Sequence, residues 1–216
     1  MLERRILASV VRYEIYGPSK DGSGRLAEGL GHGTVKDGRY LVVHNHFGVD
    51  LASFVSGSPD AVITMYNGIG DLFMWKSSPH FTVAVEEPES LVLDFGQSGD
   101  GKGFFERLGV PSALFDGWQE AAPRAGQIVA QVVWDGRRSD VAWTSINNVI
   151  LDEGTPRLVL ANPLIPGASG GGVFLEGSHI AVNWERGKHL DQTGAVMERF
   201  STAALNSSLS VEGHAD

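Results

Sequence analysis

The segment Gly167-Ala168-Ser169-Gly170-Gly171-Gly172 contains the serine whose neighbours best suit it to act as a nucleophile. Glycines on both sides let the backbone form a tight turn in which several N–H groups converge beside the serine hydroxyl. Convergent amides of this kind stabilise the oxyanion that forms during acyl transfer. The motif therefore indicates acyl-transfer chemistry at Ser169. A plain glycine-rich turn would have a similar sequence, so the interpretation also requires a base and an orienting acid.

Candidate bases and a candidate acid stand at the ends of short apolar runs upstream of this serine. His44 and His46 follow the apolar run 41–43, where a buried strand meets a polar turn, and Asp71 opens the apolar run 72–75. Histidine is the side chain that most often serves as a general base, and a partly buried carboxylate needs a partner. The sequence thus offers His44 or His46 as the base and Asp71 as the acid.

Three segments carry a resemblance that extends this interpretation. Residues 31–47 form a glycine-flanked hairpin and a strand that ends in an Asn-His pair, residues 71–75 begin with Asp, and residues 165–174 surround the serine. In composition and order these segments resemble the trypsin-like serine peptidases of the chymotrypsin fold, most closely the bacterial HtrA-type branch. The resemblance implies that His46 is the general base, Asp71 the orienting acid and Ser169 the nucleophile. It also implies that the backbone N–H groups of Gly167 and Ser169 are the oxyanion-hole donors.

The function that this resemblance implies is that of a serine endopeptidase. Ser169 would attack a peptide carbonyl to form an acyl-enzyme, with a peptide or protein as substrate and no cofactor. Ala168 departs from the family pattern, because an Asp or Asn usually precedes the nucleophile. The side-chain anchor that family members have for the oxyanion loop is therefore missing, and activation by a newly released N-terminus is not expected.

The resemblance also places a pocket for the side chain before the cleaved bond. Its floor would lie near Pro163 and Leu164, and its wall would lie on residues 180–183, with Val182 as a lining residue. No carboxylate occurs between residues 158 and 169, so we expect an apolar pocket that favours Val, Leu, Met or Phe. A shift of two residues in the wall strand would instead bring the charge of Glu185 nearer to the pocket.

Two other kinds of enzyme fit parts of the sequence. Gly167-x-Ser169-x-Gly171 matches the nucleophile elbow of α/β-hydrolases, in which Asp and His follow the serine. Those roles would then fall to residues near the end of the chain: Asp191 with His179, His189 or His214. His44-x-His46 could instead place two imidazoles on one face of a strand and bind zinc, with His32 or His80 as a third ligand.

A non-enzymatic alternative is a catalytically silent protein with the trypsin-like fold that acts as a protein-binding module. A fold does not guarantee an activity, because function depends on the residues of the site. Ala168 is the residue that favours this alternative, and the complete set of candidate catalytic residues argues against it.

The elements that would position these residues are short strands. Apolar or alternating runs lie between turn residues in two sets, which cover residues 6–16, 40–43, 61–65, 71–75, 81–85 and 91–95, and then 128–134, 141–144, 157–160, 172–175 and 179–183. The fold implied is all-β, with two antiparallel β-barrels of the chymotrypsin type. We expect an N-terminal barrel over residues 1–110 that carries His46 and Asp71, and a C-terminal barrel over residues 111–216 that carries Ser169.

Helical spacing predicts two helices outside the strands. One is a short helix near residues 112–120, and the other is a C-terminal helix over residues 200–209, where Phe200, Ala204, Leu205 and Leu209 share one face. This second helix would pack over the second set of strands.

The composition limits the remaining classes of function. The chain has 216 residues, 28 of them glycine, and its formal charge of −9 disfavours binding to nucleic acid through phosphate contacts. It has no cysteine, which excludes a cysteine nucleophile and thiolate metal sites. No apolar stretch is long enough to predict a membrane span or a signal peptide, so a cytoplasmic location is favoured over secretion. Additional domains or partner proteins remain compatible with the sequence.

Overall fold

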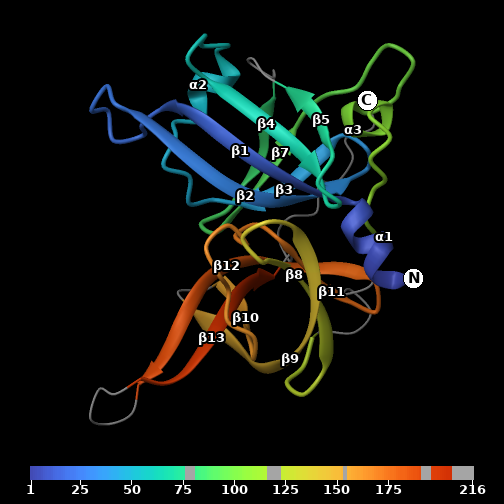
Figure 1. Ribbon diagram of the computed structural model, residues 1–216, viewed down its shortest axis with the longest axis vertical. Helices are drawn as coiled ribbons and strands as arrows, with labels where there is room; N and C mark the ends of the chain where they lie inside the picture. Colours follow the sequence, from blue (N-terminus) through green and yellow to red (C-terminus); the bar gives the residue numbers. More distant parts are fainter. Residues whose placement is uncertain (76–80, 116–122, 153–154, 191–195, 206–216) are drawn as a thin grey trace.

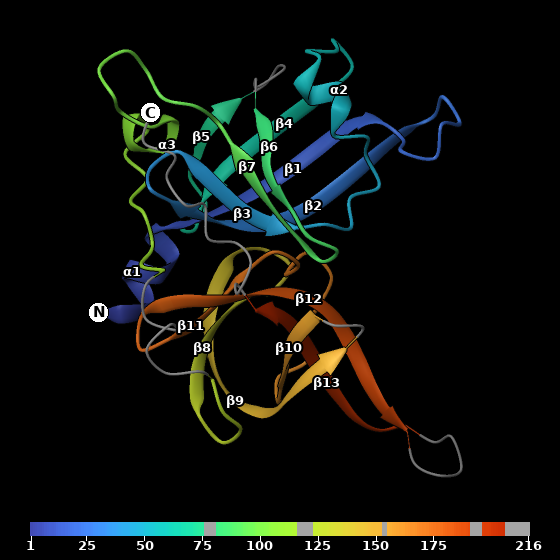
Figure 2. The ribbon, with the colours of Figure 1, turned by 180° about the vertical axis from the view of Figure 1, so that it is seen from behind.

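The computed structural model describes residues 1–75, 81–115, 123–152, 155–190 and 196–205, and most of them lie in strands. The first half contains α1 (Leu2–Ala8), β1 (Val10–Pro18), β2 (Leu26–Lys36), β3 (Tyr40–His44), α2 (Ala52–Val55), β4 (Val62–Asn67), β5 (Leu72–Trp75), β6 (Thr82–Glu86), β7 (Ser90–Asp94) and α3 (Phe104–Arg107). The second half contains β8 (Ile128–Trp134), β9 (Ser139–Asp152), β10 (Thr155–Leu160), β11 (Gly172–Leu175), β12 (Ser178–Leu190) and β13 (Val196–Leu205). Figures 1 and 2 show the two sets of strands as two curved sheets that lie against each other.

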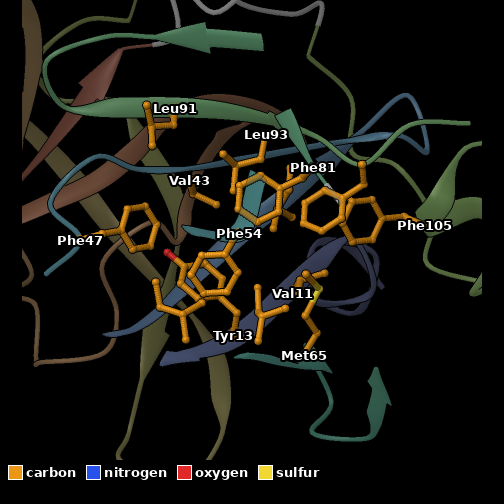
Figure 3. Packing of buried hydrophobic residues seen from close by; sticks show 14 of the residues in the cluster. Val11, Tyr13, Val43, Phe47, Phe54, Met65, Phe81, Leu91, Leu93 and Phe105 are labelled. Carbon is orange, nitrogen blue, oxygen red and sulfur yellow. The ribbon is translucent and has the colours of Figure 1, made fainter. Parts of the chain in front are cut away.

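The first sheet is antiparallel, with the strand order β5-β4-β1-β2-β3-β7-β6. It is a half-barrel rather than the closed barrel expected from the sequence, because β5 and β6 do not pair within the described residues. Alternate residues of its strands face a core that is rich in aromatic rings (Figure 3), including Val11, Tyr13, Val43, Phe47, Phe54, Met65, Phe81, Leu91, Leu93 and Phe105. This packing fixes β3, whose end carries the candidate base.

A tight turn makes the connection between β2 and β3. Asp37 and Gly38 both adopt positive φ angles, of 51° and 64°. Glycine takes up this backbone region without steric cost, and Asp tolerates it better than most residues. The Lys-Asp-Gly sequence therefore forms the hairpin that its composition indicates, and the hairpin places β3 beside β2.

The second sheet is a closed antiparallel barrel with the order β10-β13-β12-β11-β8-β9. The predicted C-terminal helix is wrong over residues 200–205, because β13 continues to Leu205 and pairs with both β10 and β12. Closure of the barrel satisfies the backbone groups of two strands that would otherwise be unpaired edges, and this outweighs the helical spacing of the side chains. Residues 206–209 lie outside the described part of the chain.

The helix α1 was not expected from the sequence, which indicated a strand from residue 6. Ile6 packs with Val10 against Ala130, Val132 and Phe174 of the second barrel. Figures 1 and 2 both show α1 beside that barrel, although β1, which follows it, belongs to the first sheet. An apolar face on α1 is therefore explained by packing across the two halves.

The connection between the sheets runs through residues 95–127. Val110 packs in the first core, and Leu114 makes an isolated parallel bridge with Ser178 of the second barrel. The division of the chain at residues 110 and 111 stays a prediction. Residues 112–115 contain no helix, and the rest of the helix predicted over 112–120 lies largely outside the described residues. Among the described helices, none is long and apolar enough to cross a membrane.

Candidate active site

The structure brings His46 and Ser169 together from the two halves of the chain. His46 follows the end of β3, and Ser169 lies in the loop between β10 and β11. The distance from His46 Nε2 to Ser169 Oγ is 3.1 Å. An imidazole at this distance from a hydroxyl can remove its proton when the hydroxyl attacks a carbonyl.

The rings around His46 set its orientation and its charge. Its imidazole stacks on that of His44, with ring centroids 4.0 Å apart, and forms a T-shaped pair with Trp184, with ring centroids 4.7 Å apart. Burial lowers the pKa of His46 below 6.5, and the positive charge of Lys20 acts in the same direction. His46 is therefore neutral at pH 7, which is the form that a general base requires.

The backbone N–H groups of the loop around Ser169 differ in whether they form hydrogen bonds within the protein. The N–H groups of Ala168, Gly170 and Gly171 donate to carbonyl groups, at 3.2, 2.9 and 3.1 Å. The N–H groups of Gly167 and Ser169 have no hydrogen-bond acceptor among the described residues. These are the two donors that the resemblance implies for an oxyanion hole.

Asn183 on β12 supports this loop from the second barrel. Its side-chain amide donates to the carbonyl of Val132 at 2.7 Å and to that of Ala168 at 3.3 Å. Its backbone carbonyl accepts the N–H of Gly170. Asn183 is fully buried, and the sequence analysis assigned it no part in the loop.

Asp71 does not reach His46 in this structure, which corrects its predicted role as the orienting acid. It lies in the turn between β4 and β5, it is exposed, and its N–H donates to Asn67 Oδ1 at 2.9 Å. The strands β4, β1 and β2 separate β5 from β3 in the sheet. The Asp-Leu run resembled a family strand, but the strand that pairs with β3 is β7.

Glu89 and Ser90 are the residues that β7 brings beside the base. Ser90 pairs with His44 across the two strands, and the carbonyl of Glu89 accepts the N–H of Asn45 at 3.0 Å. The carboxylate of Glu89 is buried, and one of its oxygens forms an ion pair with Arg157 of β10. Its other oxygen has no hydrogen-bond partner among the described residues. The ion pair links the two halves of the chain close to the site.

We expect Asp71→Asn to leave the reactivity of Ser169 within about twofold of the unchanged protein. The side chain is exposed and contacts no catalytic group, and substitutions at such surface positions usually change stability by less than about 0.5 kcal/mol. The rate of labelling by a fluorophosphonate probe measures this effect. A loss of about 10⁴, as for a wrong imidazole tautomer, would restore Asp71 to the triad.

The residues predicted to line the substrate pocket occupy different environments. Pro163 is exposed, whereas Leu164 is buried against Trp134 and Ala168 beneath the nucleophile loop. Val182 is fully buried between the two sheets, where it packs with Val42 and Val92. The structure thus does not place Leu164 and Val182 on an open surface, because both fill packing spaces. An apolar preference before the cleaved bond stays a prediction.

The zinc and α/β-hydrolase alternatives fit the geometry poorly. The rings of His44 and His46 stack, and His44 Nδ1 already accepts the backbone N–H of His46 at 3.2 Å. Among the described residues, no group of three His, Asp or Glu side chains is placed to hold a metal ion. His80, a possible third ligand, lies outside the described residues. An α/β-hydrolase needs parallel strands and crossover helices after the serine, but Ser169 is followed by antiparallel strands of a closed barrel.

Comparisons with solved structures show which known fold this chain shares. The HtrA-type protease AlgW with a bound tripeptide matches 94% of this chain at a TM-score of 0.59 and 14% sequence identity. Its complex with a decapeptide also matches at a TM-score of 0.59, with 15% identity. The Rv3671c protease of M. tuberculosis, in its active form, matches 94% of the chain at a TM-score of 0.57 and 17% identity. No family model and no curated protein sequence matches the chain.

The chain therefore has the fold of the trypsin-like serine proteases. The similar solved structures include HtrA-type proteases, and the chain spans 57% and 62% of the length of the two AlgW chains and 78% of that of Rv3671c. At these identities the likeness defines the fold alone.

Proposed function

We propose that this protein is a serine endopeptidase in which Ser169 is the nucleophile and His46 is the general base. The observation that carries the proposal is the 3.1 Å contact between these residues beside the two amides of Gly167 and Ser169. Ser169 Oγ would bond to the carbonyl carbon while its proton moves to His46 Nε2. The same proton would then pass to the leaving amine as the peptide bond breaks, and water would release the acyl group.

This mechanism uses a dyad of Ser169 and His46, in which ring stacking partly replaces the carboxylate that would orient the imidazole. No described residue accepts a hydrogen bond from His46 Nδ1, so contacts with His44 and Trp184 hold the ring. The imidazolium that forms during attack would lack a neighbouring carboxylate, and the loss of that group costs about 10⁴ in kcat in a serine protease. We therefore expect both the formation and the hydrolysis of the acyl-enzyme to be slow.

The experiment that tests this proposal is digestion of a diverse peptide mixture, with the new termini identified by mass spectrometry. We expect cleavage after Val, Leu, Met or Phe, and the same mixture should remain intact with the Ser169→Ala variant. Cleavage that persists in that variant would show a contaminating protease or another nucleophile. Consistent cleavage after Arg or Lys would overturn the apolar preference and would implicate Glu185.

The pH profile is a second expected outcome. A base must be neutral to accept a proton, and the pKa of His46 is lowered by burial and then by Lys20. Activity should therefore be lost only as the pH falls through a value below 6.5, so kcat/KM should be nearly constant from pH 7 to 8. A midpoint above pH 6.5 in steady-state measurements would contradict this placement of His46.

A second candidate function is the binding of peptides without hydrolysis. It is favoured by the absence, among the described residues, of a carboxylate that contacts His46, and the similar AlgW structures contain bound peptides. Peptides recovered intact after incubation, but bound in equilibrium dialysis, would support this function over the proposed one.

A further inference from the structure

His32 is a buried histidine on β2 that the proposed mechanism does not use, although it contacts the nucleophile loop at two points and β9 at a third. Its backbone N–H donates to the carbonyl of Ser169 at 2.8 Å. Its Nδ1 lies 2.7 Å from the carbonyl oxygen of Gly167, and its Nε2 lies 2.8 Å from Ser139 Oγ. The residue is fully buried, so these contacts are shielded from water.

We infer that His32 is a positioning residue that holds the Gly167–Ser169 loop with its oxyanion-hole amides correctly directed. It would replace the side-chain anchor that Ala168 lacks. This inference rests on the proposed function, because a directed pair of amides matters for catalysis only if Ser169 is acylated.

The chemistry of the partners determines the tautomer of the ring. The Gly167 carbonyl can only accept a hydrogen bond, so His32 Nδ1 must carry the proton. Nε2 is then the acceptor, and the hydroxyl of Ser139 donates to it. Burial, together with the smaller effect of the charge of Arg12 on the adjacent strand, lowers the pKa of His32 to about 4, although the bond to Gly167 acts in the opposite direction. The neutral ring therefore has both nitrogens satisfied.

The bond to Gly167 matters because this residue is a glycine with a φ of 95°. Glycine has a wide choice of backbone angles, so the peptide units on either side of it can rotate at little cost. The bond from His32 holds the peptide unit between Gly167 and Ala168 and so removes the rotation of that unit. Fewer combinations of φ and ψ then remain for Gly167, and fewer directions remain for its N–H in the preceding peptide unit. Without the bond, the loop could turn that N–H away from the oxyanion.

The surrounding packing keeps His32 in place for this task. Its ring lies 5.8 Å from that of Trp134, measured between centroids, and Trp134 also packs against Ala168. A Cβ on Gly170 would lie 2.0 Å from the carbonyl oxygen of His32, so only glycine allows the two backbones to approach so closely. The loop is thus held between β2 of the first sheet and Asn183 of the second.

A matched pair of variants tests the inference, because Asn and Leu have nearly the same shape. Asn can place an N–H near the position of Nδ1, and Leu cannot. We expect His32→Leu to slow fluorophosphonate labelling of Ser169 by about 10² to 10³, the usual cost of one oxyanion donor. His32→Asn should stay within about tenfold of the unchanged protein. With peptide substrate, the loss should fall on kcat while KM changes little.

Hydrogen exchange of residues 165–171 gives a readout that does not depend on activity. Exchange should be faster in His32→Leu than in the unchanged protein, and His32→Asn should largely restore it. The inference would be overturned if His32→Leu had the same labelling rate and the same exchange rate as the unchanged protein. It would also be overturned if the Leu and Asn variants lost labelling rate equally, because that result would indicate a role in packing alone. If the unchanged protein is never labelled, the proposed function fails, and the exchange comparison still decides the role of His32.

Ser139→Ala is the second variant, for use if His32→Leu does not fold. It removes the hydroxyl that donates to Nε2, so the ring can take the other tautomer and lose its bond to Gly167. We expect labelling to slow by about threefold to tenfold, since a typical hydrogen bond contributes about 1 kcal/mol. An unchanged labelling rate in folded Ser139→Ala would overturn the inference.

Discussion

Ser169→Ala and His46→Ala are each expected to lower kcat/KM for the best peptide substrate by about 10², to the background rate, because the dyad already lacks the contribution of a carboxylate. Alanine at position 169 removes the atom that forms the acyl-enzyme. Alanine at position 46 removes the acceptor that lies 3.1 Å from the serine hydroxyl. Because the two residues act as a unit, the double variant should be little worse than either single variant. Steady-state kinetics of all three proteins measures the effect.

The control is Ser23→Ala, since Ser23 is an exposed serine between β1 and β2. It should retain full activity, and Ser169→Ala should unfold at nearly the same temperature as the unchanged protein. Loss of activity through unfolding would appear as a lower melting temperature. If His44→Ala abolished turnover in a folded protein while His46→Ala did not, the base would be His44, and the assignment of the turn would be wrong by two residues.

The free energy of unfolding is expected to fall steeply between pH 7 and pH 5. Burial lowers the pKa of His32 to about 4 and that of His179 to about 3, and it lowers the pKa of His44 well below 6.5. In the unfolded chain these imidazoles titrate near 6.5, so below that pH the unfolded state binds more protons. The contribution of these histidines to stability is therefore nearly fully present above pH 6.5. It declines as the pH falls toward the pKa values that they have in the folded protein.

The magnitude follows from the linkage relation. His32 and His179 should each contribute a loss of about 2 kcal/mol between pH 7 and pH 5, and His44 should add to it. Urea unfolding at the two pH values measures the sum. His179→Gln removes one titrating group, so its pH dependence should be smaller by about 2 kcal/mol. Equal unfolding free energies at pH 7 and pH 5 would show that these histidines are not neutral in the folded protein.

The nucleophile and the base were predictable because their signals are local. The glycines around Ser169 indicate the tight turn that exposes its hydroxyl, and two of them, Gly167 and Gly170, adopt positive φ angles. His46 follows a short apolar strand that pairs on both sides and so has a fixed direction. Strands of this kind are recognisable from the alternation and boundaries of a few residues.

The sequence predicted the wrong carboxylate near the base because the order of strands in a sheet depends on residues that are far apart in the sequence. Asp71 and Glu89 each precede an apolar run, so the criterion that selected Asp71 applies equally to Glu89. Only the pairing of β7 with β3 distinguishes them, and that pairing joins residues from His44 and Ser90, 46 positions apart, to Tyr40 and Asp94, 54 positions apart. A carboxylate two residues before the apolar run 91–95 was the signal that could have identified Glu89 as a buried carboxylate near the base.

The supports of the nucleophile loop could not be inferred from the sequence for the same reason. His32 contacts Gly167 across 135 residues, and a lone histidine between glycines carries no indication of that partner. The C-terminal helix was predicted from side-chain spacing alone. Residues 200–205 form a strand because β10 and β12 offer backbone partners on both sides, and these neighbours are known only once the barrel is built.

The most direct test of the central claim is the reaction of the folded protein with a fluorophosphonate, followed by intact mass measurement and peptide mapping. If His46 and Ser169 form a working dyad, we expect one adduct per chain, located on Ser169. The adduct should be absent in Ser169→Ala and should form much more slowly in His46→Ala. Full retention of the unmodified mass, in protein whose circular dichroism and cooperative melting show that it is folded, would contradict the claim that His46 and Ser169 form a working catalytic dyad.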